Sequence, residues 1–366
     1  MDFSYSEDQQ ALRELARKIL EEQASHDRLK EILETPERVD RELWSELAKA
    51  NLLGIAIDEA HEGSGFGLSE LVILLEEVGR SVAPIPVFPT LVLAALPIAA
   101  FGSNALKSRW LPAIARGEAF LSAALVDGSE GVVKAEHDGT GWRLSGVRRL
   151  VQAGHVAQRV LVPASTGAGS LGIFLVDPAA EHAKFELVDT TDQQYRTNLH
   201  LDGARVPDAE VLGDPMGGAP ILAWLRQRAT LGLCAMQVGV AERALEITAS
   251  YARERKQFGQ PIGSFQAFHT RAGDAYVDVQ AMKLTLWRAL HLLECGEDAE
   301  ENLEIAKYWA AEGGARVTYA AMHLHGGIGV DIDYPIHRYY LWGRQIGMHL
   351  GSGAAQLAKI GAGLAA

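Results

Sequence analysis

The sequence predicts an α+β multidomain protein with an N-terminal α-helical domain (residues 1–118), a middle antiparallel β domain (119–215) and a C-terminal four-helix bundle (216–366). Three observations support this fold class. Apolar residues recur with helical spacing up to about residue 118, short alternating runs then replace that period, and long helical periodicity resumes after the turn signal PMGGAP. A chain of 366 residues has room for two or three such units.

The N-terminal part begins with a helix start signal, Ser6–Glu7–Asp8, followed by apolar residues at helical spacing. A second helix is predicted around residues 43–48, and the turn-rich stretch HEGSGFG (61–67) ends it. A third helix is predicted from Ser69 to Val82, and further helices cover the alanine-rich stretch up to about residue 116.

In the middle part, runs such as WRLSGVRRLV and QRVLVPA are bounded by the Gly, Asp and Thr clusters DGTG and STGAGS, which is typical of short antiparallel strands. The last part contains four long periodic segments with short connections, at about 220–254, 264–294, 299–322 and 335–362. Four such helices predict a bundle.

Composition excludes several classes of function. A formal net charge of -13 argues against a nucleic-acid or anionic-membrane partner. The two cysteines, Cys234 and Cys295, lie in helical apolar patterns and are predicted to be free buried thiols, and no metal-ligand spacing is visible. The charged, amphipathic N-terminus has no signal-peptide core, and prolines interrupt the apolar run 87–101. We therefore expect a cytoplasmic protein that does not enter a membrane.

The stretch HGGIGVDIDYP (325–335) is the most informative motif near the C-terminus. Its dense glycines allow a backbone to approach another molecule closely. Asp333 is either a general base aimed at that molecule or the N-cap of a helix that begins with Pro335. The residues alone favour the cap.

Four stretches resemble the acyl-CoA dehydrogenases, flavoenzymes that desaturate acyl-CoA thioesters between Cα and Cβ. They are MDFSYSEDQQALRELARKIL (1–20), GIAIDEAHEGSGFGLSELVILLEEVGRS (54–81), YARERKQFGQPIGSFQAFHTRAGDAYVDV (251–279) and HLHGGIGVDIDYPIHRYY (323–340). The resemblance spans nearly the whole chain, and it implies the same α–β–α order that the periodicity predicts.

The resemblance assigns the motif of Arg255, Gln257 and Phe258 to the ADP end of an FAD molecule held by a neighbouring subunit. A guanidinium can hold two phosphate oxygens and an aromatic face can pack on the cofactor. Gln266 falls where relatives touch the same portion of FAD. The alternatives are a solvated basic cluster at a helix C-terminus, where cations are favourable, and an exposed helical glutamine.

His323, Gly326 and Gly327 match the family's Gln-x-x-Gly-Gly element, which approaches the adenine end, although His323 stands where glutamine is usual. Asp333 falls where many relatives carry the catalytic glutamate, which removes the α-proton while hydride leaves the β-carbon for the flavin. An aspartate reaches about 1.5 Å less than a glutamate, which lowers the rate unless something compensates.

This chain departs from the family where a subunit holds its own flavin. The alternative position for a base carries Ala229, followed by Thr230 where arginine is common, and the stretch that corresponds to Thr-Glu carries Val126 and Asp127. Further departures are Leu150 in a Trp position, Gln152 in a Thr position, and Leu350-Gly351-Ser352 in place of Glu-Gly-Thr.

The motifs for a neighbour's FAD are thus retained, and most of those for the chain's own flavin ring are lost. The pattern resembles the base-lacking subunit of actinobacterial α2β2 steroid-CoA dehydrogenases. We expect one subunit of an FAD-dependent, heteromeric acyl-CoA dehydrogenase that acts on steroid side-chain or other bulky acyl-CoA esters and passes electrons to an electron-transfer flavoprotein. The alternatives are a self-sufficient homotetrameric enzyme with Asp333 as base, and a non-catalytic binding or scaffold homologue.

Overall fold

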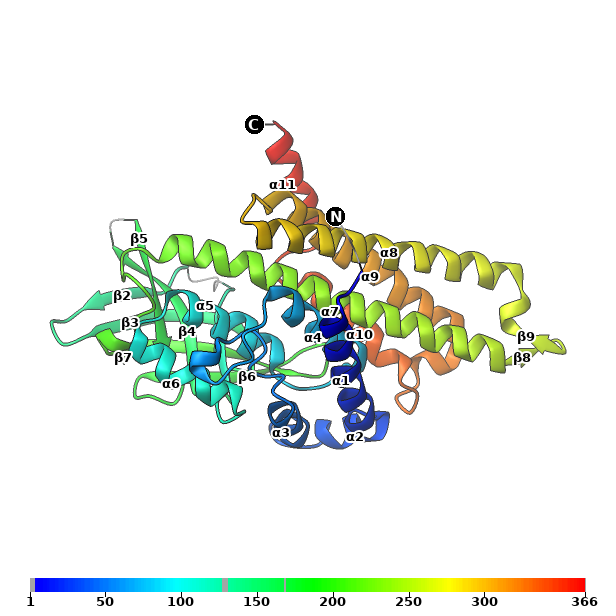
Figure 1. Cartoon of the computed structure of the whole chain (residues 1–366), viewed down its shortest axis with the longest axis horizontal. Coiled ribbons are helices and arrows are strands. Elements are labelled where there is room, and N and C mark those ends of the chain that lie inside the picture. The colour runs from blue at the N-terminus through cyan, green and yellow to red at the C-terminus, as the bar shows by residue number, and fades with distance from the viewer. Residues whose placement is uncertain (1–3, 127–130, 168, 366) are drawn as a thin grey trace. The chain divides into compact units, whose positions relative to one another are not determined.

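The computed structural model describes residues 4–126, 131–167 and 169–365, and these divide into two compact units. Unit 1 comprises residues 1–30, 72–83 and 230–366, and unit 2 comprises residues 31–71 and 84–229. The order of helices, then strands, then helices along the chain confirms the predicted fold class (Figure 1). The three predicted domain ranges stay a prediction.

Unit 2 contains a helical part and a β-sheet. Its helical elements are α3 (Arg41–Lys49), η1 (Glu59–His61), the π-helical segment η2 (Phe88–Ala95), α5 (Leu96–Phe101), α6 (Asn104–Ala115) and η3 (Asp208–Glu210). Its strands are β1 (Leu121–Ala123), β2 (Lys134–His137), β3 (Trp142–Gln152), β4 (Arg159–Gly167), β5 (Ser170–Val176), β6 (Ala183–Asp189) and β7 (Tyr195–Val206).

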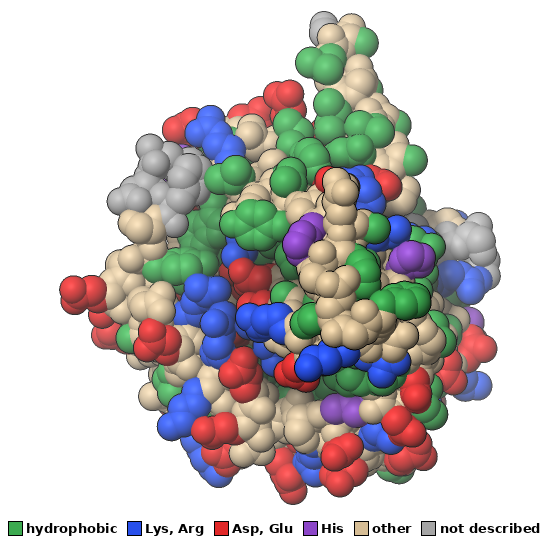
Figure 2. All heavy atoms as spheres, turned by 90° about the vertical axis from the view of Figure 1, so that its right-hand side faces the viewer, with side chains coloured by type: hydrophobic (Ala, Val, Ile, Leu, Met, Phe, Trp, Pro, Cys, Tyr) green, Lys and Arg blue, Asp and Glu red, His purple; other side chains and the backbone are tan. Residues whose placement is uncertain are grey.

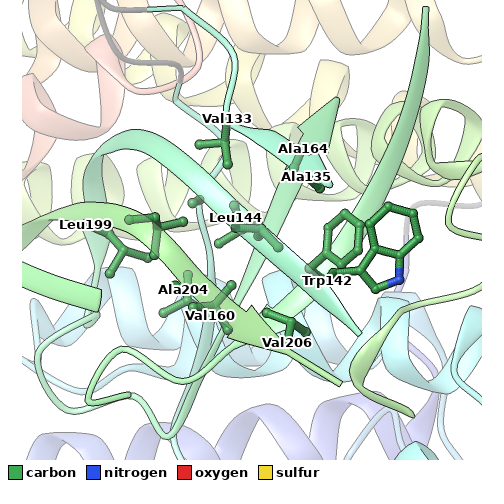
Figure 3. Close-up of a cluster of buried hydrophobic side chains, with 14 of the residues drawn as sticks. Val133, Ala135, Trp142, Leu144, Val160, Ala164, Leu199, Ala204 and Val206 are labelled. Atoms are coloured by element: carbon green, nitrogen blue, oxygen red, sulfur yellow. The ribbon is translucent and has the colours of Figure 1, made fainter. Parts of the chain in front are cut away.

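The sheet has the order β1-β4-β2-β3-β7-β6, and β5 pairs with β4. Most pairs are antiparallel, as predicted, but β4 runs parallel to β1 and meets β2 in a parallel pairing. Alternate residues of β3 and β7 fill a core in which the rings of Trp142 and Phe174 lie 5.1 Å apart (Figure 3). This alternation is the sequence pattern that identified the strands.

Unit 1 is helical. It contains α1 (Glu7–Gln23), most of α7 (Gly218–Glu254), α8 (Gln266–Cys295), α9 (Glu300–His325), α10 (Ile336–Met348) and α11 (Gly353–Ala365), with η4 (Ile262–Ser264), η5 (Gly326–Val330), β8 (Lys256–Gln257) and β9 (Gln260–Pro261) between them. Among the described residues three helices cross the unit boundary: α2 (His26–Leu33), α4 (Leu68–Ser81) and α7, whose residues up to Ala229 belong to unit 2.

Sequence and structure agree at the start of α1 and differ elsewhere. The Ser6 side chain accepts from the Gln9 backbone N–H, and the Gln9 side chain accepts from the Ser6 N–H, which is a capping box. Helix α2 was not predicted. The last predicted helix is two helices, because Leu350 (φ 55°) and Gly351 (φ 107°) turn the chain between α10 and α11. Cys234 is buried as predicted, but the prediction of a buried Cys295 was wrong: that thiol is exposed at the end of α8.

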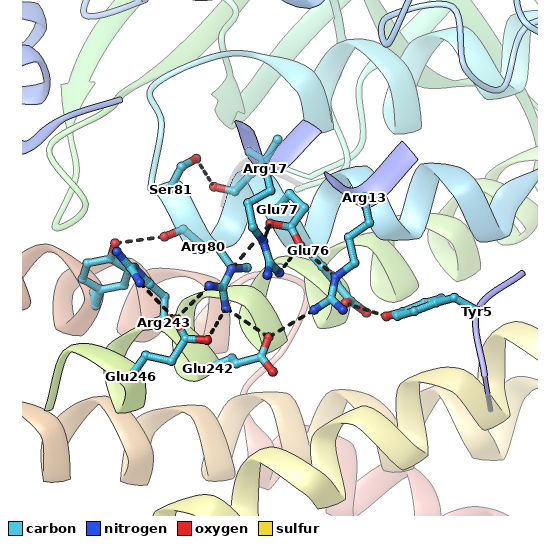
Figure 4. Close-up of polar contacts among 12 residues, drawn as sticks. Tyr5, Arg13, Arg17, Glu76, Glu77, Arg80, Ser81, Glu242, Arg243 and Glu246 are labelled. Atoms are coloured by element: carbon cyan, nitrogen blue, oxygen red, sulfur yellow. Dashed lines mark hydrogen bonds and ion pairs between the residues drawn. The ribbon is translucent and has the colours of Figure 1, made fainter. Parts of the chain in front are cut away.

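Within unit 1, α4 and α7 cross with their backbones in contact. A Cβ added to Gly239 would lie 1.9 Å from the Glu76 carbonyl oxygen, and one added to Gly79 would lie 2.1 Å from the Met236 carbonyl oxygen. Only glycine permits this approach. It brings the carboxylates and guanidiniums of α1, α4 and α7 into one network (Figure 4).

Candidate cofactor-binding site

The Arg255–Phe258 motif forms an exposed hairpin at one end of unit 1. Strands β8 and β9 pair, and the Ile262 N–H donates to the Arg255 carbonyl at 2.8 Å, which closes the base of the hairpin. The two turn residues, Phe258 and Gly259, have φ angles of 53° and 80°. Successive positive φ values are typical of a type I′ turn, whose twist suits a two-residue hairpin.

Phe258 combines a strained backbone conformation with an exposed side chain. An aromatic residue at positive φ costs about 1–2 kcal/mol. Its ring is nevertheless 93% exposed and makes only an edge contact with Phe265, at 6.3 Å between centroids. A strained backbone that presents a bare aromatic ring indicates a contact surface for another molecule.

The cations beside the ring are available for binding. Arg253 donates to the Ser250 hydroxyl at 3.2 Å, whereas the Arg255 side chain is exposed and has no partner among the described residues. The Gln257 amide donates to the adjacent Lys256 carbonyl at 2.8 Å. Figure 2 faces this end of the molecule, and Lys and Arg side chains lie in a band across its middle, beside hydrophobic ones.

A groove of about 680 Å³ lies between α8 and α9. Gln266, the first residue of α8, is exposed and lines it together with residues of the next three turns. The opposite wall carries Tyr319, over whose ring the Arg271 guanidinium lies at 5.5 Å. An ion pair between Arg316 and Asp278 (2.6 Å) also lines the groove. From the sequence, no role was predicted for Arg271, which lies within the stretch 251–279, or for Tyr319, which lies outside the four family-like stretches.

His323 and the glycine pair continue this surface at the C-terminal end of α9. The exposed His323 ring lies 6.0 Å from the Tyr319 ring. Gly326 ends α9 with φ 65° and ψ -139°, a conformation that glycine alone adopts readily. A Cβ added to Gly327 would meet nothing within 4 Å, so the backbone of both exposed glycines is open to a neighbouring molecule.

An aromatic cluster holds the glycine loop in place. The buried His325 ring stacks on Tyr251 of α7 at 4.4 Å, and its Nδ1 lies 2.7 Å from the Ala321 carbonyl. Nδ1 therefore carries the hydrogen, and Nε2 accepts from the Tyr334 hydroxyl at 3.3 Å. Burial lowers the pKa of His325, which favours this neutral form. The cluster joins the loop to the helix that leads into the hairpin.

Asp333 is not an N-cap, so that prediction was wrong. Helix α10 begins at Ile336, Pro335 occupies the cap position, and no side chain caps it. The Asp333 carboxylate instead pairs with Lys30 of α2, and its side chain is 72% exposed. The hydrogen bond from Lys30 and the charge of Lys30 hold the pKa of Asp333 below its usual range.

The positions that the resemblance assigns to the alternative base and to the flavin ring carry other groups here. Ala229 is a fully buried methyl group, so it supplies no base. Leu150 has φ 52° and is 38% exposed, and its N–H donates to the Asn198 side chain at 3.3 Å. The buried Gln152 Oε1 has no hydrogen-bond partner among the residues that the structure describes. Val126 is partly buried, and Asp127 lies outside the described residues.

Two other expectations concern metals and membranes. Among the residues that the structure describes, no three His, Cys, Asp or Glu side chains are grouped as a metal site would require. No helix in the described part of the chain is long and apolar enough to cross a bilayer.

Comparison with known proteins identifies the enzyme family to which this chain belongs. The acyl-CoA dehydrogenase C-terminal domain matches residues 218–365, and the acyl-CoA dehydrogenase N-terminal domain matches residues 6–118. The chain belongs to the acyl-CoA dehydrogenase family, whose members are oxidoreductases that act on CH–CH bonds.

Individual relatives are similar over their full length. Acyl-CoA dehydrogenase FadE27 of Mycobacterium tuberculosis is 40% identical over 375 residues, covering 100% of this chain and 99% of that protein. A chain of the ChsE4-ChsE5 complex from Mycobacterium tuberculosis is 39% identical with a TM-score of 0.95, covering 100% and 99% of the two chains. A chain of the Tcur3481-Tcur3483 steroid ACAD is 43% identical with a TM-score of 0.91, covering 98% of each.

Proposed function

We propose that this chain is one subunit of a heteromeric, FAD-dependent acyl-CoA dehydrogenase and that it binds the ADP end of the FAD held by a homologous partner subunit. The observation that carries the proposal is the hairpin, where a strained turn exposes the Phe258 ring beside an Arg255 guanidinium that has no partner among the described residues. An exposed aromatic ring on a strained turn is typical of a surface that contacts another molecule.

The residues fit the ADP half of FAD. Arg255 can form a bidentate pair with phosphate oxygens, and the bare face of Phe258 offers a stacking surface. The groove that begins at Gln266 and the open backbone of Gly326 and Gly327 extend the same surface. When bound, FAD accepts the hydride that leaves the substrate β-carbon. The residues of this chain would hold and orient its nucleotide end.

The partner would supply the flavin-ring contacts and the base. Ala229 has no acidic group, and the exposed, ion-paired Asp333 has a lowered pKa, whereas a general base near neutral pH needs a raised one. Two related subunits in an α2β2 assembly would then share each FAD. Of the similar structures, one is the ChsE4-ChsE5 complex and another is the Tcur3481-Tcur3483 steroid ACAD. They support a steroid or other bulky acyl-CoA as substrate, with an electron-transfer flavoprotein as the family's acceptor.

The visible absorption spectrum tests this proposal. The chain would be purified alone and then co-expressed with candidate partner subunits of the same family. We expect a colourless protein alone and a yellow complex with about one FAD per two chains. A yellow homotetramer with one FAD per chain would overturn the proposal and make Asp333 the leading candidate for the base. A complex without flavin would support a scaffold role instead.

A further inference from the structure

A second hollow in unit 1 lies outside the hairpin and the α8–α9 groove. It has a volume of about 330 Å³ and is formed by the end of α1, the start of α2, the end of α4, the middle of α7 and the first turn of α10. Its charged lining residues are Arg17, Glu21, Glu77, Arg80, Arg243 and Arg338. Arginines outnumber glutamates here by four to two, in a chain whose net charge is -13.

Three of these arginines already have carboxylate partners. Arg17 donates to Glu77 at 2.7 Å, Arg80 donates to Glu246 at 2.8 Å, and Arg243 donates to Glu246 at 3.0 Å (Figure 4). The salt bridges fix these side chains in the wall of the pocket. Glu77 is also the partner of Arg13, so its charge is already matched.

Arg338 differs from its neighbours. It is only 8% exposed, and its guanidinium has no hydrogen bond and no carboxylate partner among the residues that the structure describes. Its Nε is fully buried and unsatisfied. Burying an unpaired charge is unfavourable, and native proteins almost always pair such a group. The missing partner of Arg338 is therefore a group that enters the pocket which Arg338 lines.

The surroundings indicate what that group is. The Ser25 hydroxyl lines the pocket and accepts from the Arg28 N–H at 3.2 Å, which leaves its own hydrogen free to donate into the pocket. Arg338 lies in the first turn of α10, where the helix dipole favours an anion. Of the two glutamates in the lining, Glu77 is paired with arginines and Glu21 is exposed. A guanidinium fork, a hydroxyl and a helix N-terminus are the donors that bind phosphate.

We propose that this pocket is a binding site for a compact phosphate group, either free phosphate or a small phosphate monoester, with Arg338 as its main ligand. The site is independent of FAD binding and of the acyl-CoA reaction. The volume of about 330 Å³ suits a phosphate with a small organic substituent and not a nucleotide coenzyme.

Calorimetric titration tests the site on the purified full-length chain and on its complex with the partner subunit. The probes are inorganic phosphate and glycerol phosphate, at constant ionic strength set with sodium chloride. We expect saturable binding of at least one probe to both preparations. Tighter binding of glycerol phosphate would indicate a phosphorylated metabolite, and equal or weaker binding would indicate free phosphate.

Arg338→Gln should weaken phosphate binding by about tenfold or more, because it removes both the positive charge and the paired N–H donors of the guanidinium. Arg288→Gln is the matched control, since Arg288 is exposed on α8 and does not line the pocket. In buffer that contains chloride alone, Arg338→Gln should also raise the Tm, because it removes an unpaired buried charge. The proposal is overturned if neither probe binds, if Arg338→Gln binds as the unmodified chain does, or if binding disappears in the complex. A lower Tm for Arg338→Gln in chloride buffer would likewise contradict it.

Discussion

Lys30 of α2 and Asp333 of the loop before α10 form an ion pair, although 303 residues separate them in the chain. The pair engages the carboxylate for which the sequence resemblance suggested a role as catalytic base. A carboxylate that is exposed and tied to an ammonium group is a weak base, because the charged form is the stabilised one.

We therefore expect Asp333→Asn to change the turnover of the assembled enzyme by less than about threefold. Removal of a general base lowers the rate by about 10²–10⁴-fold. Steady-state kinetics on the complex measures the difference. Lys30→Gln is the matched control, since it breaks the same ion pair without touching the carboxylate. A thousandfold loss that is specific to Asp333→Asn would mean that the carboxylate is the base.

Arg255→Ala should weaken FAD retention in the complex by about 10- to 100-fold, the contribution of one or two charge-assisted hydrogen bonds. The flavin-to-protein absorbance ratio after dialysis and a fluorescence titration with FAD would measure it. Arg253→Ala is the control, because Arg253 lies two residues earlier in the chain and donates to the Ser250 hydroxyl. Equal FAD retention in the two variants would contradict the role assigned to Arg255.

The two glycines of the η5 loop should respond differently to alanine. Gly326→Ala places a side chain at φ 65° and ψ -139°, so it should lower the free energy of unfolding by about 1–3 kcal/mol. Gly327→Ala meets no atom within 4 Å and should leave the Tm unchanged while weakening FAD retention. Thermal unfolding and flavin content on both variants would show it. An unchanged flavin content in Gly327→Ala would remove that backbone from the site.

Glu76 gives the buried network of unit 1 a pH dependence. Burial raises the pKa of Glu76 to about 7, although the charge of Lys283 lowers it in part, and the Glu76 Oε1 has no hydrogen-bond partner among the described residues. Below pH 4.5 the carboxyl is protonated in both the folded and unfolded states. Between pH 4.5 and 7 only the unfolded state ionises, so the folded state loses up to about 3 kcal/mol of stability, and the loss persists above pH 7.

Glu76→Gln should therefore be more stable than the unmodified chain at pH 8 and similar to it at pH 4, because glutamine keeps the acceptor for the Tyr5 hydroxyl. Urea unfolding across this pH range measures the gap. Glu246→Gln should have the opposite effect, so this variant should be less stable than the unmodified chain at neutral pH. Burial raises the pKa of Glu246, but the hydrogen bond and charge of Arg80 outweigh it and the net shift is downward. The stability that Glu246 contributes is thus present at neutral pH and is lost as the pH falls through its folded pKa. A stability gap for Glu76→Gln that is independent of pH would contradict the raised pKa.

Much of the fold could be predicted from local sequence patterns. The Ser6 capping box, the alternating residues of β3 and the long periodic segments of α7, α8 and α9 each depend on neighbours within a few residues, so sequence spacing was sufficient to predict them. The turn at Leu350–Gly351 was missed, because helical periodicity on both sides hides a change of direction.

The sequence by itself determined the family, the order of helices and strands, and the motif residues from Arg255 to Phe258. Tertiary structure alone decided that Asp333 pairs with Lys30, that Phe258 stands exposed on a strained turn, and that the buried Arg338 side chain has no partner in the described part of the chain. The physical reason is that pairing, burial and exposure depend on which distant segments meet. Spacing along a chain shows the period of a helix or strand. It does not show which charged group of a distant segment lies next to a given side chain.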